Sequence, residues 1–314
     1  CTLSKLRYLT IVNERTRYRH YNSIHPSVSG CRYWQEEKMG FKDILVHVDE
    51  AKASQKRIRV SAELAARHDA HLIGLHPIPK PVVPALEVFA RLPPGYMEDQ
   101  IAYAAGVADS AKACFVEEAE KAGIQFEWRQ QEGHPGDVVR PHARYCDLLV
   151  LGQRDPDASH NDGNLPVSAL LSVGRPVLII PYAGDVESLG ARVMVGWDSS
   201  SQATRAVHDA LPLIAEAGHV DIIAVNPEGV GDHGAIPCAD ISLHLARHGI
   251  DAEAQSIVVT DIGVADILLS RAADKGVDLF VMGAYGHSRW RELVLGGVTA
   301  EMLEHMTMPV LMAH

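Results

Sequence analysis

Aromatic residues, long apolar runs and paired cysteines are all scarce in this sequence, and each shortage narrows what the protein can be. Phe, Trp and Tyr make up 6% of the 314 residues, so the core has to be built mainly from aliphatic side chains and alanine. No apolar run approaches the roughly 20 residues of a membrane-spanning helix, and we expect no membrane partner. The five cysteines are an odd, scattered set without metal-type spacing. They favour reduced thiols and a cytoplasmic protein over a disulfide scaffold.

Basic charge is also in short supply. The chain has 29 Lys and Arg against 40 Asp and Glu, a net charge of −11, which repels nucleic acid and anionic membranes, so neither is an expected partner. The segment 1–40 is the exception, with seven basic and three acidic residues, and it has no apolar core of a secretory signal. We interpret 1–40 as a flexible or non-native extension; a basic arm that binds a partner is the alternative.

From residue 41 onward the chain passes through the same pattern twice. FKDILVHVDE at 41–50 and ARVMVGWDSS at 191–200 are short aliphatic runs with Asp49 and Asp198 in matching places. An alanine-rich helical stretch and a second apolar run follow each of them, and the copies close with RPVLIIP and MPVLMAH. Aliphatic runs that do not alternate with polar residues are typical of strands buried on both faces.

This alternation of strands and helices predicts parallel sheets with helices on both faces. We therefore predict an α/β fold of two tandem, doubly wound, Rossmann-like domains at 41–182 and 191–314, with a short junction near 182–190. The first copy carries a proline-rich insertion at 79–100, which we predict to be surface loop.

The stretch VMGAYGHSRWRELVLGGVT places four glycines between an apolar run and a helical pattern. Gly283 and Gly286 allow the chain to bend and bring backbone amides near an anion. Gly296 and Gly297 lie at a predicted helix start, whose N–H groups and dipole favour phosphate. The segment is neither a P-loop nor a GxGxxG turn, and it contains no lysine. In parallel sheets ligands bind beyond the carboxyl ends of the strands, so Asp198 could accept hydrogen bonds there from an adenine amino group or a ribose hydroxyl.

The repeat and this glycine spacing resemble the universal stress protein family. MGAYGHSRWRELVLGGVTAEMLEHMTMPVLM is similar to the signature region of its ATP-binding members, and the resemblance covers about 41–314. It implies a tandem, two-repeat member with adenine-nucleotide alpha hydrolase-like domains, which binds ATP, with or without Mg²⁺, in the second domain. A regulatory or stress-response protein is implied, with at most weak ATPase activity because no general base is identifiable.

The resemblance also assigns a candidate nucleotide site. Its adenosine end falls on Gly196, Trp197, Asp198 and Val225, and the rest on Met282, Gly283, Gly286, Gly296, Gly297, Val298 and Thr299. Gly297 departs from the family pattern, because nucleotide-binding members usually have Ser or Thr directly after the third glycine. Losing one such hydrogen bond costs about 1 kcal/mol, or several-fold in affinity. Tyr285, between the first two glycines, is expected to pack against the loop.

The first repeat reads differently at the corresponding place. It keeps Gly152 but has Asp155 where a second glycine is expected, with Asp157 and Asp162 following. Acidic residues repel phosphate, so we predict that the first domain has a degenerate nucleotide site.

Several alternatives stay open at this point. The chain could be a slow nucleotide hydrolase or a nucleotide-free scaffold of the same fold. Family members commonly pair through the final strand, which the two repeats can satisfy within one chain, and a further homodimer is open. His244 and His248 are four residues apart on a predicted helix, but no third metal ligand is evident, so we interpret them as surface or packing histidines. Asp147 and Asp278, before matching strands, are expected to be loop or helix-end groups.

Overall fold

The chain divides into two units, Cys1–Lys38 and Met39–His314. The computed structural model describes residues 40–79, 93, 95–156, 165–227, 238–285 and 297–314, all of which belong to the second unit. The predicted extension up to residue 39 therefore lies outside the described residues, as do most of the insertion at 79–100 and two of the four loop glycines, Gly286 and Gly296.

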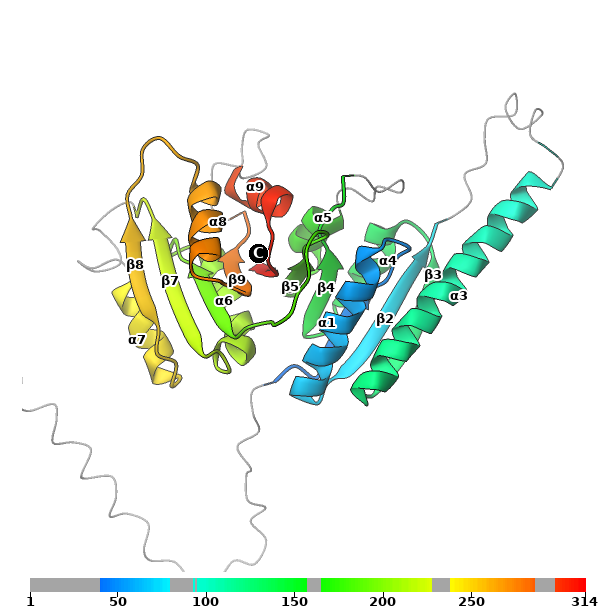
Figure 1. Ribbon diagram of the computed structural model, residues 1–314, viewed down its shortest axis with the longest axis horizontal. Helices are drawn as coiled ribbons and strands as arrows, with labels where there is room; N and C mark the ends of the chain where they lie inside the picture. Colours follow the sequence, from blue (N-terminus) through cyan, green and yellow to red (C-terminus); the bar gives the residue numbers. More distant parts are fainter. Residues whose placement is uncertain (1–39, 80–92, 94, 157–164, 228–237, 286–296) are drawn as a thin grey trace, which may run out of the picture. The chain divides into compact units, whose positions relative to one another are not determined.

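The described strands form one ten-stranded sheet (Figure 1). The first repeat contributes β1 (Asp43–His47), β2 (His71–Ile78), β3 (Phe126–Glu132), β4 (Leu148–Gly152) and β5 (Val177–Ile180). The second contributes β6 (Arg192–Gly196), β7 (His219–Val225), β8 (Glu253–Ile257), β9 (Leu279–Gly283) and β10 (Val310–Ala313). Their order is β3-β2-β1-β4-β5-β10-β9-β6-β7-β8, so the two halves have the same strand order running outward from β5 and β10.

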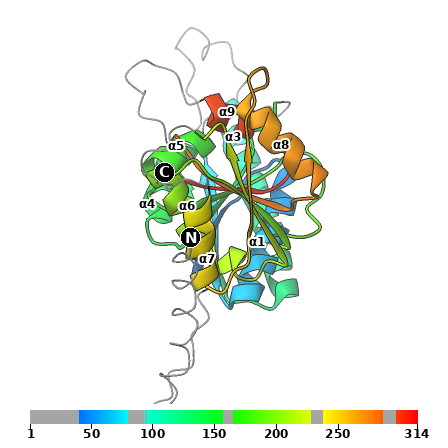
Figure 2. The ribbon, with the colours of Figure 1, turned by 90° about the vertical axis from the view of Figure 1, so that its left-hand side faces the viewer.

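Eight described helices cover the two faces of this sheet (Figure 2). They are α1 (Ala53–His68), α3 (Tyr96–Ala122), α4 (Pro135–Ala143), α5 (Leu165–Ser172), α6 (Ser201–Ile214), α7 (Ala239–Arg247), α8 (Val264–Asp274) and α9 (Gly297–His305). Buried side chains of α1, α3, α6 and α7 belong to one apolar cluster, and those of α4, α5, α8 and α9 to another. Since the strands between them contribute alternate residues to both clusters, the predicted doubly wound α/β fold is confirmed.

Helix α3 begins earlier than the sequence analysis expected. It starts at Tyr96, so the last five residues of the predicted surface loop 79–100 are helical. The physical reason lies in the local sequence: Glu98 and Asp99 occupy the first turn, where negative charge is favoured. Gly95, directly before the helix, has a φ of 88°. Glycine adopts this left-handed conformation readily, and it turns the chain sharply into α3.

The two repeats join in one sheet through β5 and β10. These strands pair antiparallel, with Leu311 opposite Leu178, whereas the other strand pairs of the sheet are parallel. Both leucines are fully buried. The pairing that the family resemblance implied is thus made within one chain, and it covers the edge of each closing strand.

The junction between the repeats is held against α1 by basic side chains. The Lys56 ammonium donates to the carbonyl oxygens of Tyr182, Ala183 and Gly184 at 3.3, 3.1 and 2.6 Å. Arg67 donates to the Leu189 carbonyl at 2.7 Å. Because these carbonyls lie outside any regular element, the side chains of α1 supply the hydrogen bonds that a strand or helix would otherwise provide.

Asp147 and Asp278 have the same structural role in the two repeats. Asp147 accepts backbone N–H bonds from Lys42 and Asp43 at 2.7 and 3.1 Å. Asp278 accepts them from Gly190, Ala191 and Arg192, at 2.8 to 3.1 Å. Each carboxylate therefore fixes the start of the neighbouring central strand, as expected for loop groups in matching positions.

Candidate functional site

The candidate site lies where the strand order of the second repeat reverses. Strand β6 has β7 on one side and β9 on the other, and Gly196 at the end of β6 is in register with Met282 of β9. Trp197 and Asp198 leave β6 at this edge. Helices leave such a point on opposite faces of the sheet, and the crevice between the diverging connections is where open α/β sheets bind ligands. Val225 ends β7 at the same edge.

Asp198 is placed by the turn that follows β6. Its Oδ1 accepts the Ser200 N–H at 3.0 Å, while Ser199 between them adopts a φ of 62°. The Ser200 hydroxyl then accepts the Ala203 N–H at 3.1 Å and caps α6, as a serine before a helix is expected to do. Asp198 remains exposed, so its carboxylate is presented at the edge of the sheet on a defined turn.

The two described loop glycines have different environments. A Cβ on Gly283 would lie 2.5 Å from the Ala203 nitrogen and 2.7 Å from the Gln202 carbonyl carbon, so only glycine lets the first turn of α6 approach β9 this closely. A Cβ on Gly297 would meet no atom of the described residues within 4 Å, and Gly297 is exposed at the first residue of α9. Close packing therefore explains why residue 283 is glycine, whereas the described residues around position 297 leave room for a side chain.

The two ends of the glycine loop are joined by a hydrogen bond. The Tyr285 N–H donates to the Thr299 hydroxyl oxygen at 3.2 Å, and Thr299 is 4% exposed. Tyr285 has a φ of 57°, and its side chain packs against the apolar cluster on the face of α8 and α9; its expected packing against the loop lies outside the described residues. Its hydroxyl is buried without a hydrogen-bond partner among the described residues, and burial raises the pKa of the Tyr285 phenol. The hydrogen bond between Tyr285 and Thr299 holds the start of α9 beside the end of β9.

The predicted site residues do not all point the same way. Trp197 packs partly buried against the cluster on the face of α6 and α7. Val225, Met282 and Val298 belong to the cluster on the face of α8 and α9. The structure thus brings the described members of the predicted set to one edge of the sheet and divides their side chains between its two faces. Gly286 and Gly296 stay predictions.

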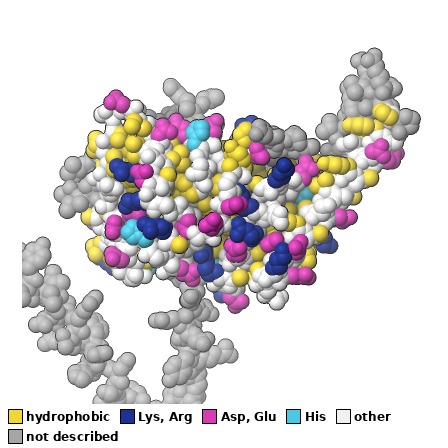
Figure 3. All heavy atoms as spheres, viewed as in Figure 1, with side chains coloured by type: hydrophobic (Ala, Val, Ile, Leu, Met, Phe, Trp, Pro, Cys, Tyr) yellow, Lys and Arg dark blue, Asp and Glu magenta, His cyan; other side chains and the backbone are white. Residues whose placement is uncertain are grey.

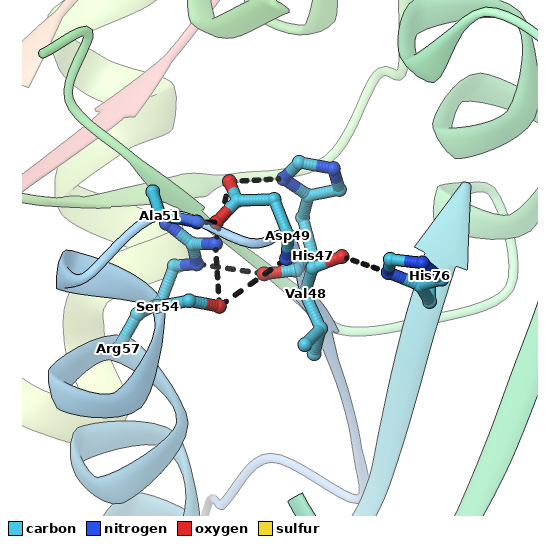
Figure 4. Close-up of polar contacts among 7 residues, drawn as sticks. All are labelled: His47, Val48, Asp49, Ala51, Ser54, Arg57 and His76. Carbon is cyan, nitrogen blue, oxygen red and sulfur yellow. Dashed lines mark hydrogen bonds and ion pairs between the residues drawn. The ribbon is translucent and has the colours of Figure 1, made fainter. Parts of the chain in front are cut away.

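The first repeat forms the same turn at its own switch point, between β1 and β4. Asp49 Oδ1 accepts the Ala51 N–H at 3.1 Å, which matches the turn at Asp198. The other carboxylate oxygen of Asp49 pairs with Arg57 Nη2 at 2.9 Å (Figure 4). Arg57 also donates from Nε to the His47 carbonyl at 2.6 Å and from Nη2 to the Ser54 hydroxyl at 3.2 Å.

Arg57 occupies the space over the glycine that ends β4. A Cβ on Gly152 would lie 2.2 Å from Arg57 Nη1, and the arginine is 2% exposed. In the second repeat the matching glycine, Gly283, faces the backbone of α6 instead. The carboxylate of the first repeat is therefore engaged by a buried guanidinium from its own chain.

Burial and charge set the ionisation of this cluster. Burial alone would raise the pKa of Asp49, but the adjacent Arg57 and His47 hold it below its usual range. Burial lowers the pKa of His47 to about 4, against the attraction of Asp49. Histidine is then neutral at pH 7, and the network carries one balanced ion pair. His76 lies beside this cluster, with its Nδ1 atom 2.9 Å from the Val48 carbonyl oxygen (Figure 4).

Sequence reasoning missed Arg57 and Gln153. Gln153 donates from Nε2 to the carbonyls of Leu303 and Glu304, both at 3.1 Å, and accepts the Tyr182 N–H at 3.1 Å, so it links the repeats. In the sequence Arg57 resembles a surface charge on a helix and Gln153 resembles a loop residue, so neither indicates the contacts that it makes. His208 of α6 adds a third imidazole to the pair His244 and His248: the His244 ring centroid lies 5.1 Å from that of His208 and 4.8 Å from that of His248.

The comparisons with known proteins agree with this geometry. The model of the Universal stress protein family matches residues 40–180 and 191–314. A universal stress protein from Synechocystis sp. is 27% identical over 170 residues, covering 52% of this chain and 57% of the relative; the chain thus matches less than two thirds of that relative's length.

Two solved structures share the fold over most of the chain. A universal stress protein from Archaeoglobus fulgidus superposes with a TM-score of 0.66 at 18% identity, covering 86% of this chain and 97% of that one. A functionally unknown protein from Pseudomonas aeruginosa gives 0.55 at 15% identity, with 87% and 92% covered. At this level of identity the likeness concerns the fold.

Proposed function

Because this chain belongs to the universal stress protein family, we propose that it is a regulatory, stress-response protein that binds ATP in its second repeat. The observation that carries the proposal is the switch point between β6 and β9, where Gly196 lies beside Met282. This register brings the turn that carries Asp198 and the end of β9, from which the glycine loop leaves, to the same edge of the sheet. Asp198 would meet the adenine or ribose, and the loop with the start of α9 would meet the phosphates.

Differences between the two repeats support one site per chain. In the first repeat Arg57 pairs with Asp49 and fills the space above Gly152, so a nucleoside would have to displace a buried guanidinium that already has a carboxylate partner. In the second repeat the backbone of α6, and not an arginine, lies over Gly283. Asp198 is exposed. The first repeat is therefore proposed to be structural.

The thiols and the surface charges of the described residues are compatible with a regulatory protein of the cytoplasm. Cys114, Cys146 and Cys238 are unpaired thiols, and none of the described helices is both long and apolar enough to cross a membrane. On the face shown in Figure 3, basic and acidic side chains are interspersed. ATP would act by binding one conformation or partner complex more tightly than another, with Mg²⁺ as the counter-ion of the phosphates.

Calorimetric titration of nucleotide-stripped protein with ATP, ADP and AMP, each with Mg²⁺, tests the proposal. We expect one ATP site per chain, weakened at least about tenfold by Asp198→Asn through the loss of a charged hydrogen-bond acceptor. Gly286→Asp is expected to abolish binding because it adds negative charge to the loop. Asp240→Asn, at an exposed acid on α7, is the matched control. A folded wild-type protein that binds none of the three would favour the nucleotide-free scaffold.

A further inference from the structure

A cluster of metal-ligating side chains lies at the opposite end of β7 from Val225. His219 and Asp221 are two residues apart on β7 and so project from the same face of the sheet. Glu253 of β8 is in register with Asp221. Each of the three offers one ligand atom, and these atoms all lie within 4.8 Å of one another. Within this group, His219 Nε2 is 3.2 Å from Asp221 Oδ2.

Asp221 is the unusual member, because it is a carboxylate in the middle of a buried strand. It is 4% exposed and lies between Val220 and Ile222, at 2% and 0%. A buried carboxylate is unfavourable unless both its oxygens have partners. Lys275, the residue that follows α8, donates to Oδ1, which leaves Oδ2 directed at His219. The two oxygens therefore have separate tasks, one toward the lysine and one toward the imidazole.

This division is the one that a carboxylate ligand has in a metal site. One oxygen binds the ion, and the other accepts a hydrogen bond from an outer residue that fixes its orientation. We propose that His219, Asp221 and Glu253 bind a divalent transition metal, with Zn²⁺ as the fitting ion and Lys275 as the outer partner of Asp221. One imidazole with two carboxylates suits Zn²⁺ and disfavours Ca²⁺ and Mg²⁺, which prefer oxygen ligands alone.

The charges and the access to solvent are compatible with this ion. Two carboxylates and one ammonium leave one negative charge for a divalent cation to neutralise. Glu253 is exposed and His219 is partly exposed, so the ion can enter from solvent and keep water in its fourth position.

Titration of the full, untagged, metal-stripped chain with ZnCl₂, followed by calorimetry, tests the site. Co²⁺ serves as a second probe, because its visible absorption bands report a four-coordinate nitrogen and oxygen site. The exposed ligands are the ones to change: His219→Gln and Glu253→Gln are each expected to weaken one Zn²⁺ site at least about tenfold. Asp221 is left intact, since its loss would strand Lys275.

His248→Gln is the matched control, because it removes an imidazole from the His208–His244–His248 cluster and leaves β7 untouched. Its Zn²⁺ affinity and Co²⁺ spectrum should equal those of the wild type. Circular dichroism verifies that each variant is folded. Unchanged Zn²⁺ binding in both the His219 and Glu253 variants would overturn the proposal, as would loss of binding in the His248 variant alone.

Discussion

At the residue scale, a single arginine distinguishes the carboxyl edges of the two repeats. Asp49 and Asp198 make the same turn, each accepting the N–H two residues on. Arg57 then pairs with Asp49 and covers Gly152, whereas Gly283 is covered by the backbone of α6. The Arg57 side chain therefore occupies the carboxyl edge of the first repeat, although the strands of the two repeats have the same order.

Gly297 is the residue at which the proposed nucleotide affinity can be raised. Gly297→Ser should tighten ATP binding several-fold, because the Cβ meets no atom within 4 Å in the described part of the chain and the hydroxyl adds one hydrogen bond of about 1 kcal/mol to the phosphates. Gly297→Ala is the control that fills the same space without a hydroxyl. Calorimetry compares the two variants with the wild type. Equal affinity in all three would place the phosphates away from the start of α9.

His47 gives the protein a dependence of stability on pH. Burial lowers its pKa in the folded state to about 4 from 6.5, so below pH 6.5 the unfolded chain takes up a proton that the folded chain refuses. Stability should therefore fall as the pH drops from about 6.5 to 4, by about 3 kcal/mol from this group. Urea unfolding at a series of pH values measures it.

The matched variants separate this histidine from the general acid sensitivity of the protein. His47→Gln should flatten the slope between pH 6.5 and 4, whereas His305→Gln, at an exposed site on α9, should not. A slope that persists in the His47 variant would assign the pH dependence to other groups. Asp49, whose pKa is held low mainly by Arg57 against its burial, contributes below that window.

At the scale of the elements, the sequence pattern predicted the strands well because their cause is local. Runs such as ILVHV and VMVG are continuous and aliphatic, and strands buried on both faces need that composition. The matching aspartates before β4 and β9 were interpretable for the same reason. The start of α3 was predicted wrongly, because a proline-rich stretch ends at Gly95 and the helical residues after it carry no apolar periodicity.

The parts of the site that escaped prediction depend on contacts between distant residues. Arg57 lies 95 residues before Gly152, the glycine it covers, and nothing in SQKRIRV indicates that its guanidinium turns inward. Gln153 binds carbonyls of α9, which is far from it in sequence. Spacing reports which face a residue occupies, but the identity of its partner requires the packed structure.

Asp278 is expected to control the start of β6. Its carboxylate accepts three backbone N–H groups and the Ser188 hydroxyl, so Asp278→Ala leaves several donors unpaired and should cost about 2–3 kcal/mol. Asp274→Ala, at an exposed site on α8, should stay within about 0.5 kcal/mol of the wild type. Urea denaturation gives both values. A loss below 1 kcal/mol would show that water replaces the carboxylate at little cost.

At the scale of the whole molecule, the antiparallel pair of β5 and β10 makes the repeats dependent on each other. Leu178 and Leu311 face one another across it and are fully buried. Gln153, the residue after β4, adds hydrogen bonds to α9, and Arg205 of α6 donates to the Gly174 carbonyl at 2.6 Å. Each repeat is thus missing a sheet neighbour without the other, which favours unfolding as one cooperative unit.

Leu178→Ala tests this dependence, because the substitution lies in the first repeat while its partner lies in the second. Removing the buried side chain should destabilise the protein by about 3 kcal/mol. Hydrogen exchange followed by mass spectrometry should then show faster exchange in β6 and β9 as well as in β1 and β4, since both halves open through the same transition. Leu170→Ala, in α5 of the first repeat and 3% exposed, is the control for a loss of core packing away from the pair. If Leu178→Ala accelerated exchange in β1 and β4 alone, the repeats would be separate folding units that merely share a sheet.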